Sequence, residues 1–327
     1  MRTEICYQGK LFPSDPEKTV PISMGLSRDG IIVLWASRIG AEEILSWGDA
    51  GIAMSTQTPQ GHSVSIARYN SDGDFLSATS IENFSLCWPF IGEFPNGDIC
   101  LVAARCAFNQ GQPENNARIY DSDGNFLREG CFGDGVEHLA IDDNGLIWVG
   151  YFDEGIFGNR GWDNPLGAAG IVAWSADFHR NWEMPDYLIA DTYSLNIANQ
   201  EVISCPYTGL DNDFPFVRIR DGKATTWETN SEVSGPFGVV SNGWEYVTIG
   251  SYEHSLAFSR HLLEGNRLRS SRSGVLSIDE GGTALLEGLQ GKDEQRRKAG
   301  PVWDKVICRG RVAHFFVGSH WFTYEME

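Results

Sequence analysis

The chain has 327 residues, of which 42% are hydrophobic, and its 25 basic and 44 acidic residues give a formal net charge of −19. Such an acidic surface repels phosphate backbones and anionic lipid, so we expect neither nucleic acid nor a membrane as a partner. The chain is also rich in glycine (37 residues) and contains 11 Trp, 10 Tyr and 18 Phe. This composition favours a sheet protein with many tight turns.

The cysteines and the apolar segments bear on the cellular location of the protein. Seven cysteines occur without regular spacing, mostly inside apolar strand-like runs, where a free thiol behaves as a small hydrophobe. The N-terminus has no apolar signal-peptide core, and no apolar run reaches the ~18 residues of a membrane span. We therefore predict a reducing, cytoplasmic location.

One pattern recurs along the chain, in which an apolar run is followed by a tight turn and a second apolar run. The turns lie at residues 28–30, 95–97, 143–145 and 241–243, with degenerate copies at 198–200 and 309–310. Asp-Gly and Asn-Gly favour a hairpin here because the turn needs a positive φ. The second strand of each hairpin is predicted at residues 31–36, 99–104, 146–151, 201–205, 244–249 and 312–317.

A second class of turn follows later in each unit, after a further strand. Examples lie at residues 71–73, 122–124 and 221–222. Each unit is then four antiparallel strands, and the six first turns predict six such units. We predict an all-β fold, a six-bladed β-propeller, with seven blades as the alternative.

The two ends of the chain are expected to meet in one blade. Residues 306–308, 312–317 and 320–324 look like three strands of a last blade that lacks its fourth. The N-terminal strand at residues 3–7 would complete it and leave no exposed edge. Residues 1–327 would then form a single propeller domain.

Residues 273–300 do not fit the repeat. They contain a candidate hairpin, with strands at 275–279 and 283–289 on either side of Gly281-Gly282, followed by a charged run at 292–298. We interpret 273–300 as a charged surface insertion, because it does not supply four strands for a seventh blade. The surrounding residues 260–311 carry 11 Lys/Arg and 7 Asp/Glu. They read as a solvated basic surface or, alternatively, as a docking patch for an acidic partner.

The repeat also resembles a family pattern. Residues 141–150, Ile-Asp-Asp-Asn-Gly-Leu-Ile-Trp-Val-Gly, are similar to the blade signature of NHL, two-component-sensor and SMP-30/gluconolactonase-type propellers. The resemblance implies a propeller fold and does not by itself assign an activity.

Function is expected where long connections gather. The loops at residues 39–62, 106–116, 152–170 and 206–214 are long, while the other turns are minimal. In a propeller these long loops would surround one mouth of the central channel, a suitable place for a small polar or aromatic ligand or for a partner protein. The predicted ligand-binding residues are Trp88, Arg105, Tyr151, Glu154, Asn159, Arg160, Trp162, Tyr207, Tyr252, His254 and His320.

A catalytic reading centres on Glu137, His138 and Asp153, in which His138 would act as a general base. SMP-30-like lactonases hold a metal with a Glu near the channel mouth, and the resemblance implies that role for Glu137. Asp153 and Glu154 would be further ligands of a divalent cation such as Ca²⁺, which prefers oxygen donors. The alternatives are a hydrogen-bonded structural His138 and a solvated acidic rim.

The sequence contains no Gly-x-Ser-x-Gly, His-Glu-x-x-His, Cys-x-x-Cys, phosphate-binding or Gly-x-Gly-x-x-Gly motif. Our first hypothesis is a propeller that binds a small molecule or a protein on its long-loop face. The alternatives are a metal-dependent hydrolase or lactonase of the SMP-30 type, and a protein-interaction scaffold.

Overall fold

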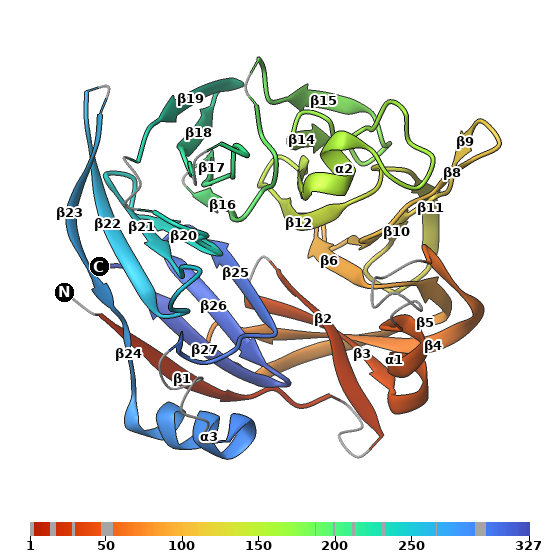
Figure 1. Cartoon of the computed structure of the whole chain (residues 1–327). Helices are drawn as coiled ribbons and strands as arrows, with labels where there is room; N and C mark the ends of the chain where they lie inside the picture. The colour runs from red at the N-terminus through yellow and green to blue at the C-terminus, as the bar shows by residue number, and fades with distance from the viewer. Residues whose placement is uncertain are drawn as a thin grey trace. The chain divides into compact units, whose positions relative to one another are not determined.

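The computed structural model describes residues 3–13, 18–27, 30–46, 55–186, 188–198, 200–210, 213–229, 233–265, 267–291 and 299–327. The chain divides into two compact units: unit 1 comprises residues 1–10 and 191–327, and unit 2 comprises residues 11–190. Most of the described residues form small antiparallel sheets, an arrangement consistent with a β-propeller (Figure 1). None of the helices in the described ranges is long and apolar enough to cross a membrane.

Unit 2 is built from four-stranded sheets whose strands are antiparallel neighbours. The first contains β2 (Thr19–Leu26), β3 (Gly30–Ser37), β4 (Gln57–Asn70) and β5 (Phe75–Leu86). The second contains β6 (Pro89–Glu93), β7 (Ile99–Ala103), β10 (Ala117–Tyr120) and β11 (Phe126–Gly130). The third contains β12 (Val136–Ile141), β13 (Ile147–Tyr151), β14 (Ile171–Trp174) and β15 (Arg180–Glu183). The long connections hold α1 (Arg38–Ile44), α2 (Asp153–Phe157) and a small hairpin of β8 (Phe108–Asn109) and β9 (Gln112–Pro113).

The sheets of unit 2 meet through their first strands, since β2 and β12 both lie against β6. Glycine makes one of these contacts possible: a Cβ on Gly25 of β2 would collide with the backbone oxygen of Ile91 in β6. Aliphatic side chains that are fully buried, such as Ile32, Leu34 and Leu101, fill the space between the first two sheets. The core therefore holds the strand ends, and the loops that follow them, in fixed positions.

Unit 1 has one four-stranded and one nine-stranded sheet among its described residues. The smaller sheet contains β20 (Gly238–Ser241), β21 (Glu245–Ile249), β22 (Ala257–Glu264) and β23 (Arg267–Val275). The larger contains, in spatial order, β19 (Lys223–Trp227), β18 (Phe216–Arg220), β17 (Glu201–Ser204), β16 (Leu195–Ala198), β25 (Lys305–Arg309), β26 (Val312–Val317), β27 (His320–Glu325), β1 (Glu4–Lys10) and β24 (Ser277–Ile278).

The nine-stranded sheet joins two groups of four strands, and β24 is added beside β1 through two parallel residue pairs. Within each group the pairing is antiparallel, whereas β16 and β25 pair in parallel through only two residue pairs. The N-terminal strand β1 pairs antiparallel with the C-terminal β27, with Cys6 opposite Thr323 and Lys10 opposite His320. The first and last strands of the chain therefore share one sheet. The number of blades and the closure of a ring stay predictions.

The predicted tight turns are present where the structure describes them. Gly97, Gly145 and Gly243 have φ angles of 90°, 79° and 96°, the left-handed conformation that glycine adopts without strain. At the turn between β12 and β13, Asp142 Oδ1 accepts hydrogen bonds from the backbone N–H groups of Asn144 and Leu146, at 2.9 and 3.0 Å. The turn predicted at 28–30 falls largely outside the described residues.

The hairpin predicted within 273–300 is wrong. Its second strand is instead a helix, α3 (Glu280–Gln290), which follows β24 (Figure 1). Asp279 caps the helix because its Oδ1 accepts from the Gly282 N–H at 2.7 Å, and its Oδ2 accepts from the Tyr7 N–H of β1 at 2.8 Å. The capping aspartate was a helix-start signal that the Gly281-Gly282 pair obscured. The charged run at 292–298 lies outside the described residues, and the interpretation of 273–300 as an insertion stays a prediction.

Candidate functional site

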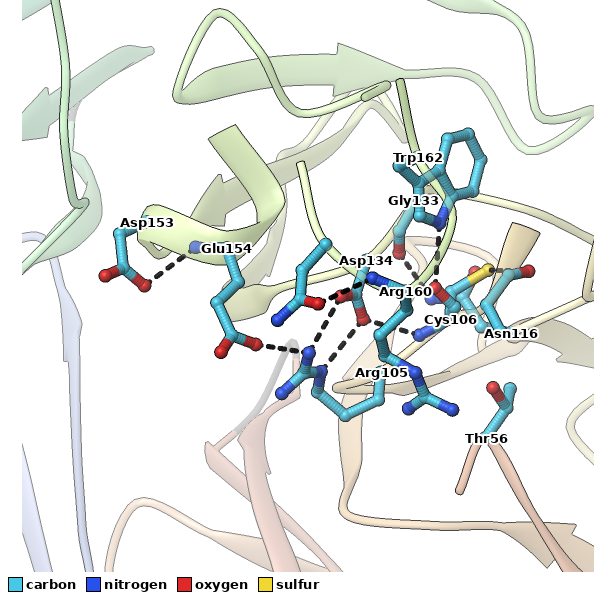
Figure 2. Close-up of polar contacts among 12 residues, drawn as sticks. Thr56, Arg105, Cys106, Asn116, Gly133, Asp134, Asp153, Glu154, Arg160 and Trp162 are labelled. Atoms are coloured by element: carbon cyan, nitrogen blue, oxygen red, sulfur yellow. Dashed lines mark hydrogen bonds and ion pairs between the residues drawn. The ribbon is translucent and has the colours of Figure 1, made fainter. Parts of the chain in front are cut away.

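In unit 2, the segments that follow β7 and β13 meet the segment that precedes β12. Arg105, just after β7, is only 3% exposed, and Asp134, just before β12, is 1% exposed. Arg105 donates from Nε and Nη2 to the two carboxylate oxygens of Asp134, both at 2.9 Å (Figure 2). This fork-to-fork geometry is the strongest form of an arginine–carboxylate pair.

Further contacts complete the surroundings of Arg105. Asp134 Oδ1 also accepts from the backbone N–H of Cys106 at 2.7 Å, and Arg105 Nη2 contacts Glu154 Oε2 in α2. The Phe152 ring lies 5.4 Å from the guanidinium carbon. Burial lowers the pKa of Arg105, but the hydrogen bonds and charges of Asp134 and Glu154 outweigh burial and raise it. Arg105 therefore stays protonated, with its charge neutralised by carboxylates of the protein.

A second arginine, Arg160, lies in the loop after α2 and is bound differently. Its backbone is held in a left-handed conformation with φ of 51°, where its N–H donates to Asn159 Oδ1 at 2.7 Å and its C=O accepts from the Phe108 N–H at 2.9 Å. Its side-chain Nη1 is buried and has no hydrogen-bond partner within the described ranges. Figure 2 shows the Arg160 side chain extending from the loop with no contact drawn to its guanidinium.

The charge of Arg160 acts on a neighbouring thiol. Burial raises the pKa of Cys87, at the entry to β6, to about 11, and the Arg160 charge opposes this rise. The Arg160 charge favours the Cys87 thiolate, while its Nη1 makes no hydrogen bond to the described residues. Arg160 Nη1 is thus a buried donor that no group of the described chain uses.

The predicted tryptophans of this region support the loops. Trp162 is 7% exposed, and its Nε1–H donates to the backbone oxygen of Cys106 at 2.8 Å, while its ring packs on Phe108 with centroids 5.0 Å apart. Trp88, half-buried between β5 and β6, donates from Nε1 to the backbone oxygen of Ser46 at 3.0 Å. Both indoles hold connecting segments in place.

Tyr151, the last residue of β13, is fully buried. Its hydroxyl donates to the backbone oxygen of Phe132 at 2.6 Å and accepts from Trp174 Nε1 at 3.2 Å. Burial raises its pKa far above the ordinary value. Its hydroxyl is used within the sheet, so the structure gives it a supporting position behind the site.

The residues predicted for catalysis lie on two neighbouring elements. Glu137 and His138 are near the start of β12, where the register with β13 shifts, and Asp153 is the exposed first residue of α2. Within the described part of the chain, no three His, Cys, Asp or Glu side chains are grouped as a metal site requires. Glu154 contacts Arg105, a cation that disfavours a second cation at the same carboxylate. The catalytic and metal assignments stay predictions.

The tyrosines predicted for unit 1 form an aromatic cluster with two residues that were not in the ligand-binding set. Tyr207 stacks on Phe214 with centroids 5.2 Å apart, and Tyr193 meets Phe214 edge-on at 5.1 Å. Tyr252 is 56% exposed, and its hydroxyl donates to the Tyr193 hydroxyl at 2.7 Å. Burial, followed by the hydrogen bond with Tyr252, raises the pKa of Tyr193.

The two histidines predicted for ligand binding in unit 1, His254 and His320, make contacts with other residues than those of the aromatic cluster. His254 accepts from the Leu256 N–H at its Nδ1, at 3.0 Å, and lines a cavity of about 350 Å³ between α3 and the segments around it, with Glu287 among the polar lining groups. His320 in β27 meets the Tyr7 hydroxyl at 2.9 Å through Nδ1. Burial, with the nearby charge of Lys10, lowers the pKa of His320.

Sequence reasoning missed two residues that organise the unit 2 site. Asp134 lies between Gly133 and Gly135, whose φ angles are 94° and 71°, and this Gly-Asp-Gly pattern before a strand was the available signal. Asn116 is fully buried; its Nδ2 donates to the backbone oxygens of Ala103 and Gly133, at 3.1 and 2.9 Å. It ties the end of β7 to the segment that carries Asp134, and nothing local in the sequence marked it.

No protein-family model and no curated protein sequence matches the chain. The structure is similar to that of Kluyveromyces lactis Hsv2, a β-propeller-like protein, with a TM-score of 0.50 and 11% identity, covering 94% of this chain and 74% of that chain. Lower TM-scores relate it to a luciferin-regenerating enzyme (0.46, 9% identity, 96% of this chain and 92% of that chain). A nidogen/laminin complex is also similar (0.42, 14% identity, 82% and 86%). The likeness to Hsv2 shows a β-propeller-like fold, and the resemblance to a particular propeller family stays a prediction.

Proposed function

We propose that the protein is a binding protein that uses the loops around Arg105 and Arg160 to recognise an anionic group of a small molecule or of a partner protein. The observation that carries the proposal is the buried Nη1 of Arg160, which has no hydrogen-bond partner within the described ranges. Leaving a buried donor unpaired costs about 1–3 kcal/mol, and more when the donor is charged. A ligand that accepts from Nη1 regains that free energy.

The two arginines have separate parts in this proposal. Arg105 is bound by groups of the protein, because Asp134 accepts two hydrogen bonds from it and Glu154 contacts it as well. It positions α2 and the segment before β12. Arg160 is held by its backbone to Asn159 and Phe108, which leaves its guanidinium to face a ligand.

The chemistry of arginine narrows the ligand class. A planar guanidinium matches the two oxygens of a carboxylate or a phosphate group. With a net charge of −19, the protein as a whole repels anions, so recognition must come from short-range contacts. We expect modest association rates and selectivity for a ligand that fits the loops closely.

The scaffold we propose is a six-bladed propeller completed by β1. It is supported by four separate four-stranded sheets and by the two further four-strand groups joined in the nine-stranded sheet of the described chain. The pairing of β1 with β27 supports a closing blade built from both termini.

The test is calorimetric titration of the protein with succinate, citrate, inorganic phosphate and a short oligo-glutamate peptide. Arg160→Gln should weaken binding of the anion that binds the wild type by roughly 10- to 100-fold, the value of a charged hydrogen bond. Arg160→Lys keeps the charge but not the planar guanidinium, so its affinity should lie between those of the wild type and Arg160→Gln.

Arg128→Gln is the matched control, because Arg128 is also in unit 2 and its side chain is 42% exposed. The affinity of Arg128→Gln for the same anion should equal that of the wild type. If no probe binds, or if Arg160→Gln binds as tightly as the wild type, the proposal is overturned. Binding of the peptide but not of the small anions would place the function with a protein partner.

A further inference from the structure

Two of the free cysteines in unit 2 lie against each other beside the candidate site. Cys106 Sγ and Cys131 Sγ are 3.5 Å apart, although 24 residues separate them along the chain. Cys106 follows Arg105 after β7 and is fully buried, whereas Cys131 follows β11 and is partly exposed. A disulfide needs the sulfurs to approach to about 2.05 Å, so a movement of roughly 1.5 Å would join them.

The hydrogen bonds of the pair give the two thiols different roles. Cys131 Sγ accepts from the backbone N–H of Gly133 at 3.3 Å. Cys106 Sγ can donate to the Glu114 backbone oxygen, 3.2 Å away, or to Cys131. The accepted N–H favours a thiolate at Cys131, while Cys106 supplies the S–H.

The surrounding charges act on both groups. The hydrogen bond with Cys106 lowers the pKa of Cys131, and together with the Gly133 N–H it outweighs burial and the carboxylates of Asp134 and Glu114, which raise it. The pKa of Cys106 is raised by the hydrogen bond with Cys131 and by burial. A low-pKa, accessible thiol next to a protonated one is the arrangement of a peroxide-sensitive cysteine with its resolving partner.

We infer that Cys106 and Cys131 form a dithiol oxidation site, which hydrogen peroxide converts to a disulfide. The Cys131 thiolate attacks one peroxide oxygen, breaks the O–O bond and becomes a sulfenic acid as hydroxide leaves. The Cys106 thiol then attacks the Cys131 sulfur, the S–O bond breaks and water leaves. The two thiols lose two electrons, peroxide is reduced, and the products are one disulfide and two water molecules.

The disulfide would connect the two segments that carry the site. Cys106 donates its backbone N–H to Asp134 and accepts from Trp162 through its C=O, and Cys131 lies three residues before Asp134. A bond between the sulfurs would fix the segment after β7 to the segment before β12. Oxidation would therefore restrain the two segments whose contacts hold Arg105.

The test treats the reduced 327-residue protein with stoichiometric hydrogen peroxide, alkylates the remaining thiols after unfolding, and maps the peptides by mass spectrometry without reduction. The wild type should give a Cys106–Cys131 cross-link with the other five cysteines alkylated. In Cys106→Ser, the Cys131 sulfenic acid should persist and be captured by dimedone, while Cys131→Ser should give neither product.

Cys6→Ser is the control, because Cys6 is the other partly exposed cysteine and lies in unit 1. It should leave the cross-link unchanged. In the wild type, where folding of a variant is not at issue, Cys131 should react with peroxide at least about tenfold faster than Cys6. Equal rates for the two cysteines, or a wild type oxidised at Cys131 without the cross-link, would overturn the inference.

Discussion

Two clusters differ in the interactions that hold them together. The ionic cluster of unit 2 consists of Arg105, Asp134 and Glu154, and the aromatic cluster of unit 1 consists of Tyr193, Tyr207, Phe214 and Tyr252. Both are formed by residues at strand ends and in the connections that follow. In unit 2, an ion pair between Arg105 and Asp134 is withdrawn almost completely from water. In unit 1, Tyr193, Phe214 and Tyr252 meet ring to ring, and Tyr252 remains 56% exposed.

The difference shows how each cluster responds to the loss of one member. A buried charge without its partner carries a desolvation cost that nothing offsets, so the ionic cluster depends on every member. An aromatic cluster gains free energy from ring contact and buried area, and the loss of one hydroxyl leaves most of it intact. The ionic cluster is therefore suited to fixing geometry, and the aromatic cluster to presenting an adaptable surface.

The largest expected effect tests the ionic side of this comparison. Asp134→Asn should destabilise the protein by about 3–5 kcal/mol, because it leaves the buried Arg105 charge without its main partner. Denaturant unfolding followed by tryptophan fluorescence measures the change.

Asp177→Asn provides the matched control. Asp177 also pairs with an arginine of unit 2, Arg128, but at 3.5 Å and with 71% of its side chain exposed. An exposed pair of this kind contributes at most about 1 kcal/mol. Similar losses for the two variants would contradict the assigned role of Asp134.

A smaller effect tests the aromatic side. Tyr252→Phe removes the hydroxyl that donates to Tyr193 but keeps the ring, and should cost about 0.5–1 kcal/mol in the free energy of unfolding. Tyr151→Phe is the buried counterpart in unit 2 and leaves the Phe132 carbonyl and Trp174 Nε1 without their partner. It should cost about 1–3 kcal/mol. The comparison fails if the exposed tyrosine proves the more costly to change.

The smallest expected effect concerns how the free energy of unfolding changes with pH, through the hydroxyl of Tyr193. The pKa of Tyr193 is raised in the folded protein, so above the ordinary value of about 10 the unfolded chain loses this proton first. The stabilisation is complete below about pH 10 and is lost as pH rises toward the folded pKa. Tyr193→Phe should therefore lose less stability than the wild type above pH ~10, as measured by unfolding at a series of pH values. Parallel curves would show that Tyr193 does not contribute this dependence.

The backbone pattern was largely predictable because its signals are local. Asn-Gly at 96–97, 144–145 and 242–243 fixes a positive φ in each turn, and the alternation of apolar and polar residues sets the strands on either side. α3 was missed although Asp279 is a standard cap, because Gly281-Gly282 reads as a turn when only neighbouring residues are considered. At this point the Asp279 cap favours a helix and the glycine pair favours a turn. The packing of Leu286 in the unit 1 core favours the helix.

For the candidate site, the places of three residues relative to the strands were predictable, and their contacts were less so. Arg105, Glu154 and Arg160 were expected in the connections after strands, and the structure places them there. The contacts that distinguish Arg105 from Arg160 were not predictable, since Arg105 is bound by Asp134, which is 29 residues away. The Cys106–Cys131 contact is likewise formed by segments separated in the chain.

The sequence by itself determined the repeating hairpins, the mostly-β character and the connections in which polar residues collect, because turn conformation and side-chain alternation depend on near neighbours. Only the tertiary structure decided which polar group meets which. Hydrogen bonds and ion pairs act over a few ångströms in space, and the sheets of each unit bring together segments that no spacing along the chain connects. Two neighbouring loops thus hold one arginine that is bound by carboxylates of the protein and another whose buried Nη1 has no hydrogen-bond partner in the described chain.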